Sequence, residues 1–158
     1  MTSDSLQVGG KGSISPFDGG PAQDASADRS ARKSVLIIED EPGLAEIIAI
    51  NLQASGYDAT IAHDGLQALY LLDRSTPDVI LLDLQLPQIS GFRLIQLLRG
   101  REATVTVPVI VMTALSFREA EDVIRAGADA FLTKPFAPEE IVARVGQLIA
   151  HRADVRGE

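Results

Sequence analysis

Six polar side chains stand at the ends of four short apolar runs in this chain. They are Glu39, Asp40, Glu41, Asp83, Thr113 and Lys134. Carboxylates can bind a divalent cation or attack a phosphorus atom, and a hydroxyl or an ammonium can bind phosphoryl oxygens. If the fold brings these residues together, their types indicate phosphoryl-transfer chemistry.

The apolar runs predict strands that place these residues at one edge of a sheet. The runs are Val35–Ile38, Val79–Leu82, Val109–Met112 and Ala130–Thr133. Most of them are rich in β-branched residues, as is typical of strands covered on both faces. Because helix-like segments separate the runs, we expect parallel strands. Their C-terminal ends then meet at the edge where open α/β sheets bind ligands.

The segments between the runs carry helix signals. Pro42 suits the first position of a helix. The residues of this helix that we predict to be buried are Leu44, Ile47, Ile48 and Leu52. A further strand is expected at Tyr57–Ala62, and the later helices are predicted to begin near Asp64, Ser90, Ser116 and Pro138. Strand and helix thus alternate along the chain, as in α/β proteins.

Composition excludes several classes of function. The chain has 158 residues, 46% of them hydrophobic, which suits a single domain, and it has no cysteine for disulfides or zinc. Residues 34–150 hold 16 acidic and 8 basic side chains and so carry the whole net charge of −8, which argues against direct nucleic-acid contact by this segment. With no membrane span and no signal peptide in the sequence, we expect a cytoplasmic protein.

Asp83 is the candidate nucleophile, because it ends an apolar strand. Taken alone, it is equally consistent with a helix cap or a solvated turn residue. The three successive acids at 39–41 would repel one another and Asp83 unless a cation lies among them, and Mg²⁺ suits such oxygen ligands. A solvated acidic turn is the alternative explanation.

Lys134 is the only lysine after residue 33, and the other basic residues up to 150 are arginines. A compact ammonium at a strand end is well suited to bind a phosphoryl oxygen. The alternative is a surface lysine without a role. Thr113 could donate its hydroxyl to the same group, or it could be an ordinary β-branched strand residue. The joint placement of these residues favours a site.

At these residues the chain resembles the receiver domain of two-component response regulators. The matching motifs are Ile38–Pro42, Leu82–Pro87 with Gly91, Met112–Ala114 and Lys134–Phe136. The resemblance covers residues 34–151 and is strongest to the branch whose members carry a winged-helix output domain, which we do not expect within this chain. It implies a flavodoxin-like (βα)5 fold, an α/β three-layer sandwich around a parallel sheet of order 2-1-3-4-5.

The resemblance also implies a mechanism. Asp83 would accept a phosphoryl group from a sensor histidine kinase or a phosphotransfer protein. Mg²⁺ would be held by Asp40, Asp83 and the backbone carbonyl of Gln85, with Glu39 acting through water. Such a domain is a signalling switch that assists its own phosphorylation and dephosphorylation rather than a metabolic enzyme. Gln85 and Leu115 flank the site and are expected to tune the lifetime of the phosphate.

Further residues take roles from the same resemblance. Lys134 and Thr113 would bind the phosphoryl oxygens, and the Lys134–Pro135 peptide bond is expected to be cis. The inward shift of Thr113 would be coupled to rotation of Phe131 on the fifth strand. Because Phe131 has no hydroxyl, it could switch only through packing.

The face formed by the fourth helix, fifth strand and fifth helix is a possible homodimer surface. Asp129, Glu140 and Arg144 match charges that pair across this face in the winged-helix branch. Ala130 and His151 stand where an acidic and a basic partner are usual, so part of the salt-bridge set is missing. We expect a disordered tail at 1–33, a receiver domain at 34–151 and a short C-terminal tail at 152–158.

Two other functions could use some of the same residues as a phosphorylated switch. A haloacid-dehalogenase-type enzyme also uses an aspartyl nucleophile and Mg²⁺, but it needs an Asp-x-Asp motif, which the chain lacks. A receiver-like scaffold that acts without phosphorylation is the second alternative, and the complete set of acids, Asp83, Thr113 and Lys134 argues against it. Whether the domain stands alone or precedes an output domain stays open.

Overall fold

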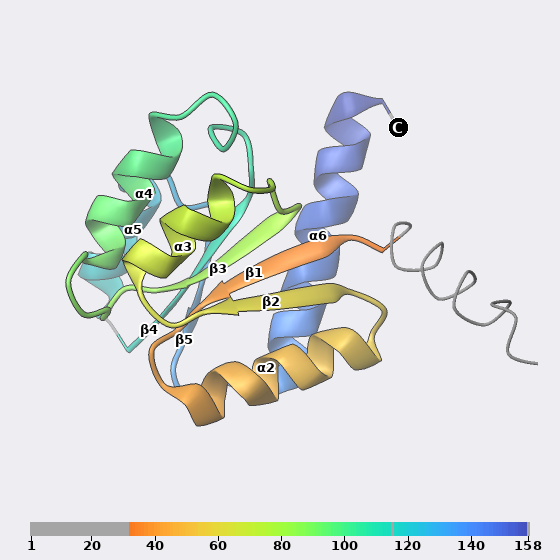
Figure 1. The fold of residues 1–158 in the computed structure, drawn as a ribbon, viewed down its shortest axis with the longest axis horizontal. Helices are drawn as coiled ribbons and strands as arrows, with labels where there is room; N and C mark the ends of the chain where they lie inside the picture. The colour runs from red at the N-terminus through yellow and green to blue at the C-terminus, as the bar shows by residue number, and fades with distance from the viewer. Residues whose placement is uncertain (1–31, 115, 158) are drawn as a thin grey trace, which may run out of the picture. The chain divides into compact units, whose positions relative to one another are not determined.

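The structure is a computed structural model that describes residues 32–114 and 116–157; most of the predicted N-terminal tail, residues 1–31, lies outside this part. The strands are β1 Ser34–Ile38, β2 Asp58–Ala62, β3 Val79–Asp83, β4 Val109–Thr113 and β5 Ala130–Thr133. The helices are α2 Pro42–Ala54, α3 Gly65–Leu72, α4 Gly91–Arg99, α5 Phe117–Ala126 and α6 Pro138–Arg156. All strands are parallel and lie in the order β2-β1-β3-β4-β5 (Figure 1), which confirms the predicted flavodoxin-like fold.

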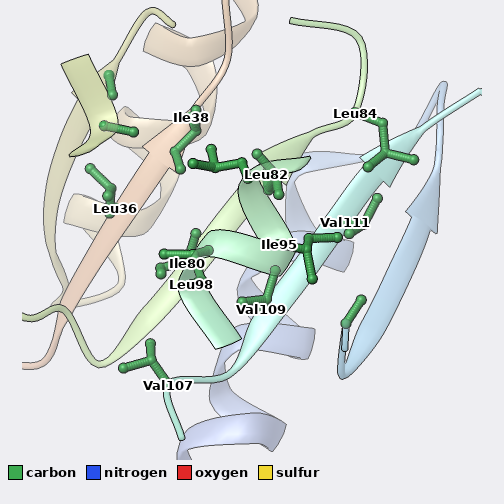
Figure 2. Close-up of a cluster of buried hydrophobic side chains, with 14 of the residues drawn as sticks. Leu36, Ile38, Ile80, Leu82, Leu84, Ile95, Leu98, Val107, Val109 and Val111 are labelled. Carbon is green, nitrogen blue, oxygen red and sulfur yellow. The ribbon is translucent and has the colours of Figure 1, made fainter. Parts of the chain in front are cut away.

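Alternate strand residues build two cores on opposite faces of the sheet. Leu36 and Ile38 of β1 belong to the core covered by α3, α4 and α5, whereas Val35 and Ile37 belong to the core covered by α2 and α6. Figure 2 shows the first core, in which side chains of α4 pack against the central strands. Every residue of β3 and β4 is buried. This burial on both faces explains why these two strands are nearly continuous apolar runs in the sequence.

The buried face of α2 differs from the prediction at one position. Ile48 and Leu52 are buried as predicted, but Ile47 is 50% exposed, and Ala45 and Ala49 lie inward instead. The small alanine side chains let the helix pack close to the sheet. The prediction was wrong because it favoured a large apolar residue over alanine for the inward position.

Side chains cap the starts of three helices that the sequence predicted, and a glycine ends α5. Asp64 accepts a hydrogen bond at the start of α3, and Ser90 does so at the start of α4. Ser116 and Glu119 form a reciprocal capping box on α5, which ends at Gly127 with φ of +123°. These caps satisfy backbone groups that have no partner within the helix.

Several strands differ by one residue from the predicted runs, and α6 extends past the predicted domain boundary. Strand β2 begins at Asp58, because the N–H of Tyr57 is bonded to the carbonyl of Leu52 at 3.0 Å in the turn after α2. Helix α6 continues to Arg156, so the predicted boundary after residue 151 falls inside a helix. No helix in the described part of the chain is long and apolar enough to cross a membrane.

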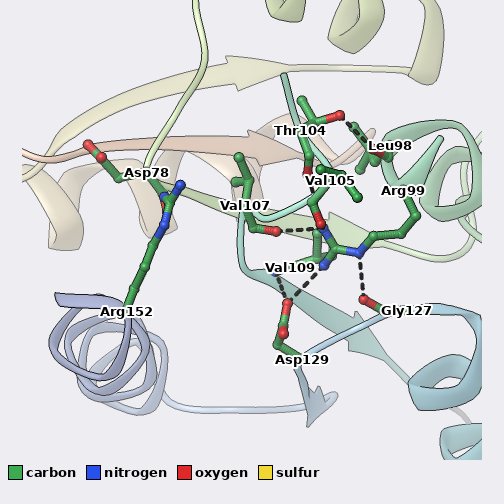
Figure 3. A network of polar contacts seen from close by, with 10 residues as sticks. All are labelled: Asp78, Leu98, Arg99, Thr104, Val105, Val107, Val109, Gly127, Asp129 and Arg152. Carbon is green, nitrogen blue, oxygen red and sulfur yellow. Dashed lines mark hydrogen bonds and ion pairs between the residues drawn. The ribbon is translucent and has the colours of Figure 1, made fainter. Parts of the chain in front are cut away.

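Arg99, the last residue of α4, joins three segments at the edge of the sheet opposite the predicted site (Figure 3). Its guanidinium donates hydrogen bonds of 2.8–3.1 Å to the backbone carbonyls of Thr104, Val105, Val107 and Gly127. It also pairs with Asp129 at 2.9 Å, and the same carboxylate oxygen accepts the N–H of Val109 at 2.8 Å. This single side chain therefore holds the loop before β4 and the junction of α5 and β5 together.

Candidate functional site

The parallel sheet brings the predicted site residues to one edge. Glu39 and Asp40 follow β1, Asp83 is the last residue of β3, Thr113 is the last residue of β4, and Lys134 follows β5. Strand β1 pairs with β3, β3 with β4, and β4 with β5, all in parallel register. The carboxyl ends of four neighbouring strands therefore supply the site, at the place where ligands bind in open α/β folds.

Lys134 connects two buried carboxylates. Its Nζ donates to Glu39 Oε1 at 3.0 Å and to Asp83 Oδ2 at 3.3 Å. Glu39 is 1% exposed and Asp83 is 4% exposed, so these charges are largely removed from water. The Lys134–Pro135 bond, which lies in the loop before α6, is cis, as the family resemblance implied. A buried charge pair of this kind needs hydrogen bonds on its remaining oxygens.

Backbone N–H groups supply those hydrogen bonds. The N–H of Glu41 donates to Glu39 at 3.2 Å, and the N–H of Gln85 donates to Asp83 Oδ1 at 3.0 Å. One oxygen of each carboxylate is thus held by the main chain, and the other faces Lys134. Each carboxylate is fixed in position by two contacts.

Glu39, Asp40 and Asp83 form a group that could hold a metal ion. One oxygen of each lies within 4.8 Å of the others, and Asp40 is exposed. Three carboxylates, of which Asp40 is exposed to solvent, fit Mg²⁺, which binds a few carboxylates and keeps several waters. The donor chemistry of the residues therefore matches the expected ion.

The pKa values of two residues show how strongly the charges interact. The pKa of Glu39 is raised from 4.5 to about 7, mainly by burial and also by Asp83, while hydrogen bonds from Lys134 and the Glu41 N–H act to lower it. Burial alone would lower the pKa of Lys134, but its contacts with Glu39 and Asp83 outweigh burial and raise it. Lys134 therefore stays an ammonium at neutral pH, whereas Glu39 is only partly ionised there even with Lys134 beside it.

Thr113 lies on β4, next to the strand that carries Asp83, and Phe131 lies on β5, on the far side of β4. Thr113 is buried at the end of β4, and its carbonyl accepts the Lys134 N–H at 2.7 Å. Phe131 is paired with Val111 in the register of β4 and β5, and its partly buried ring packs against the core beneath α4 and α5. Leu115, expected to flank the site, lies outside the described residues.

The acidic residues predicted for a dimer surface make contacts within the chain. Asp129 pairs with Arg99, as described above. Glu140 accepts the N–H of Ala137 at 3.0 Å and so caps the start of α6. Both carboxylates thus have structural partners, which the sequence prediction did not anticipate.

Two features near the site were missed by the sequence analysis. Gln88, in the loop after Asp83, has φ of +70°, a left-handed value that is uncommon outside glycine. A cavity of about 340 Å³ beside Lys134 is lined by Leu44, Pro135 and Phe136. Neither has a sequence signal, since one is a backbone conformation and the other joins segments far apart in the chain.

Comparison with known proteins decides the family. The family model described as the response regulator receiver domain matches residues 35–146 of the chain. The chain belongs to this receiver family. Its site residues thus lie in a domain of two-component signal transduction, as the sequence motifs suggested.

Curated relatives of this receiver domain are longer proteins. The regulator RpaA of Synechocystis sp., named a DNA-binding dual master transcriptional regulator, is 43% identical over 118 residues, which cover 73% of this chain and 48% of RpaA. MtrA of Mycolicibacterium smegmatis, named a DNA-binding response regulator, is 37% identical over 80% of this chain and 55% of its own length. The chain spans about half the length of the curated relatives it matches.

Solved receiver domains share the fold. The receiver domain of the Francisella response regulator 1452 is 33% identical, with a TM-score of 0.73, and the match covers 77% of this chain and 99% of that domain. The receiver domain of the sensor histidine kinase PA1611 of Pseudomonas aeruginosa is 30% identical, with a TM-score of 0.70 over 75% of this chain and 98% of that domain. That structure has a magnesium ion coordinated in its active-site cleft.

Proposed function

We propose that Asp83 accepts a phosphoryl group from a phosphohistidine on a sensor histidine kinase or a phosphotransfer protein. The observation that supports this most strongly is the contact of buried Asp83 with Lys134 at 3.3 Å, beside the acidic pair Glu39 and Asp40. A carboxylate without a chemical role would rarely be buried among other acids. The arrangement supports a phosphorylated switch over a scaffold that acts without phosphorylation.

In the transfer, a carboxylate oxygen of Asp83 attacks phosphorus as the bond to the histidine nitrogen breaks. The nitrogen keeps the electron pair of that bond and then takes a proton, and Asp83 becomes an acyl phosphate. Lys134 would hold one phosphoryl oxygen, and the Thr113 hydroxyl would hold a second. Transfer of this kind depends mainly on positioning and on the balance of charge.

The proposed metal ligands are those implied by the family resemblance, and the grouping of Glu39, Asp40 and Asp83 supports them. Asp40, Asp83 and the backbone carbonyl of Gln85 would hold Mg²⁺, and Glu39 would act through a water molecule. When bound, the ion would neutralise negative charge on the phosphoryl group during transfer. Glu39 also has a second role, because it holds Lys134 beside Asp83.

The surface beside the site suits a protein partner. Ile47 and Ile50 of α2 are 50% and 57% exposed, and the cavity lined by Leu44 and Phe136 lies next to Lys134. An apolar surface next to a reactive carboxylate supports docking of the kinase or phosphotransfer protein there. Histidine kinases use ATP, so such a partner also supports a cytoplasmic location.

The output surface is proposed to be α5, β5 and α6. Phosphorylation would draw Thr113 inward and let Phe131 repack, and the altered face would control a downstream output such as transcription. A homodimer through this face would use Arg144, with Asp129 and Glu140 pairing across it in addition to their intrachain contacts. The acidic charge of residues 34–150 supports an output that involves no direct nucleic-acid contact by this segment.

Acetyl phosphate tests the proposed function without the cognate kinase. The protein is incubated with acetyl phosphate and Mg²⁺, and its intact mass is followed over time, with EDTA added in a parallel sample. We expect the mass of one phosphoryl group to appear, to decay after acetyl phosphate is removed, and to be absent with EDTA. No gain in mass would favour the phosphorylation-independent scaffold.

A further inference from the structure

Helix α4 begins in direct contact with the backbone of the proposed phosphoacceptor. The N–H of Gly91 donates to the carbonyl of Leu84 at 3.0 Å. A Cβ at Gly91 would lie 2.5 Å from Leu84 Cα, 2.8 Å from Leu84 Cδ2 and 3.0 Å from the carbonyl oxygen of Asp83. Contacts this short with backbone atoms do not occur in folded proteins, so the backbone would have to move.

The loop between Asp83 and Gly91 is closed at its base by this contact. Inside it, the N–H of Gln85 holds Asp83 Oδ1 at 3.0 Å, and the N–H of Ile89 bonds to the carbonyl of Pro87 at 2.8 Å around Gln88. A three-residue turn with a positive central φ is rare and strained. The surrounding structure must therefore hold the loop in this shape.

The geometry points to Gly91 as a positioning residue for phosphorylation of Asp83. This inference rests on the proposed function. Without a side chain at 91, α4 approaches the Asp83–Leu84 peptide closely enough to close the loop. The closed loop aims the Asp83 carboxylate at Lys134 and places Gln85 beside it. A methyl group at 91 would push the peptide away and misplace both residues, although it touches neither substrate nor metal.

Two control variants show whether a loss of phosphorylation rate comes from the contact at Gly91 or from any change in a nearby helix. Gly43 lies in the first turn of α2, close to the acidic residues, and a Cβ there has nothing within 4 Å. Ser90 caps α4 by accepting the N–H of Arg93 at 3.2 Å, so Ser90→Ala weakens the same helix end without a new contact at Asp83. Gly43→Ala and Ser90→Ala should therefore leave the phosphorylation rate near that of the wild type.

The experiment compares Gly91→Ala with these controls in three measurements. They are the rate of phosphorylation by acetyl phosphate, the Mg²⁺ affinity by calorimetric titration, and the amide chemical shift of Gln85 in metal-free protein. For Gly91→Ala we expect the rate to fall by about 10- to 100-fold, as for a displacement near 1 Å, with weaker Mg²⁺ binding and a shifted Gln85 amide. If this variant is unfolded in buffer, sucrose is added to restore the fold and the assay is repeated there.

Each result of this experiment either supports or overturns the role of Gly91 in positioning Asp83. A folded Gly91→Ala protein that is phosphorylated at the wild-type rate overturns the inference, as does an equal loss of rate in Ser90→Ala. Recovery of the full rate in sucrose also overturns it, because only stability was then affected. If the wild type itself takes no phosphoryl group, the proposed function fails, whereas a defect confined to Gly91→Ala supports both.

Discussion

Lys134 donates a hydrogen bond to Glu39 at 3.0 Å, although 95 positions separate the two residues in the chain. This contact is shorter than the 3.3 Å contact between Lys134 and Asp83. Glu39 therefore holds the ammonium beside the proposed acceptor before any phosphoryl group arrives. Pre-positioned charge of this kind avoids reorganisation during the reaction.

The titration of Glu39 is the first prediction. In metal-free protein we expect its carboxyl to titrate at about 7, because burial disfavours the charged form. The folded protein then binds this proton more tightly than the unfolded chain does. The stability that Glu39 contributes is therefore fully present below pH 4.5 and is lost as the pH rises through about 7. Carboxyl-carbon NMR measures the midpoint directly.

Glu39→Gln is the control for this pH dependence, since its amide does not titrate. The free energy of unfolding of the wild type, relative to the variant, should fall as the pH rises from about 4.5 to about 7 in EDTA. Added Mg²⁺ should lower the Glu39 midpoint. A difference between the two proteins that stays constant over this range would contradict the assigned environment.

Arg99→Ala is expected to lower the free energy of unfolding by about 2–4 kcal/mol, because it removes the donor to four backbone carbonyls and the ion-pair partner of Asp129. Arg101→Ala is the matched control. Arg101 pairs with Asp73 at the surface, where such pairs contribute about 0–1 kcal/mol. Urea unfolding measures both variants, and equal losses would refute the central role of Arg99.

Gln88→Gly should stabilise the protein by about 0.5–1 kcal/mol, since glycine adopts the φ of +70° without strain. The control is Gln147→Gly in the exposed middle of α6, which should destabilise by about 1 kcal/mol. Urea unfolding of the two variants should therefore give changes of opposite sign. Destabilisation by Gln88→Gly would show that the turn is not strained.

Arg144→Glu tests the proposed dimer surface. In the presence of Mg²⁺ and acetyl phosphate, we expect sedimentation to show a dimer of the wild type that this substitution weakens by reversing a charge. Arg74→Glu in the turn after α3, away from α5, β5 and α6, should leave association unchanged. If both variants sediment as the wild type does, this face makes no dimer.

Much of the site was predictable because residues at the carboxyl ends of neighbouring parallel strands lie close together at one edge of the sheet. Asp83 and Thr113 end neighbouring strands, so a strand pattern alone places them at the same edge. The order of the strands came from the resemblance of the motifs, since periodicity does not distinguish one parallel order from another. The cis Lys134–Pro135 bond was likewise expected from the motif and is present.

Other features depended on contacts that a local pattern does not contain. Arg99 meets Asp129 only after α4, β4 and β5 pack together, so no spacing in the sequence signals the pair. Ile47 has the expected helical spacing, yet close packing on the sheet favours Ala45 and Ala49. The conformation of Gln88 is imposed by closure of its loop, against the preference of its own residue type.

The most direct test of the central claim is the intact mass of the wild type and of Asp83→Asn after incubation with Mg²⁺ and acetyl phosphate. Asparagine keeps the size of the side chain but provides no carboxylate to attack phosphorus. We predict that the wild type gains one phosphoryl group and that Asp83→Asn gains none. An equal gain by the folded variant would contradict the assignment of Asp83 as the acceptor.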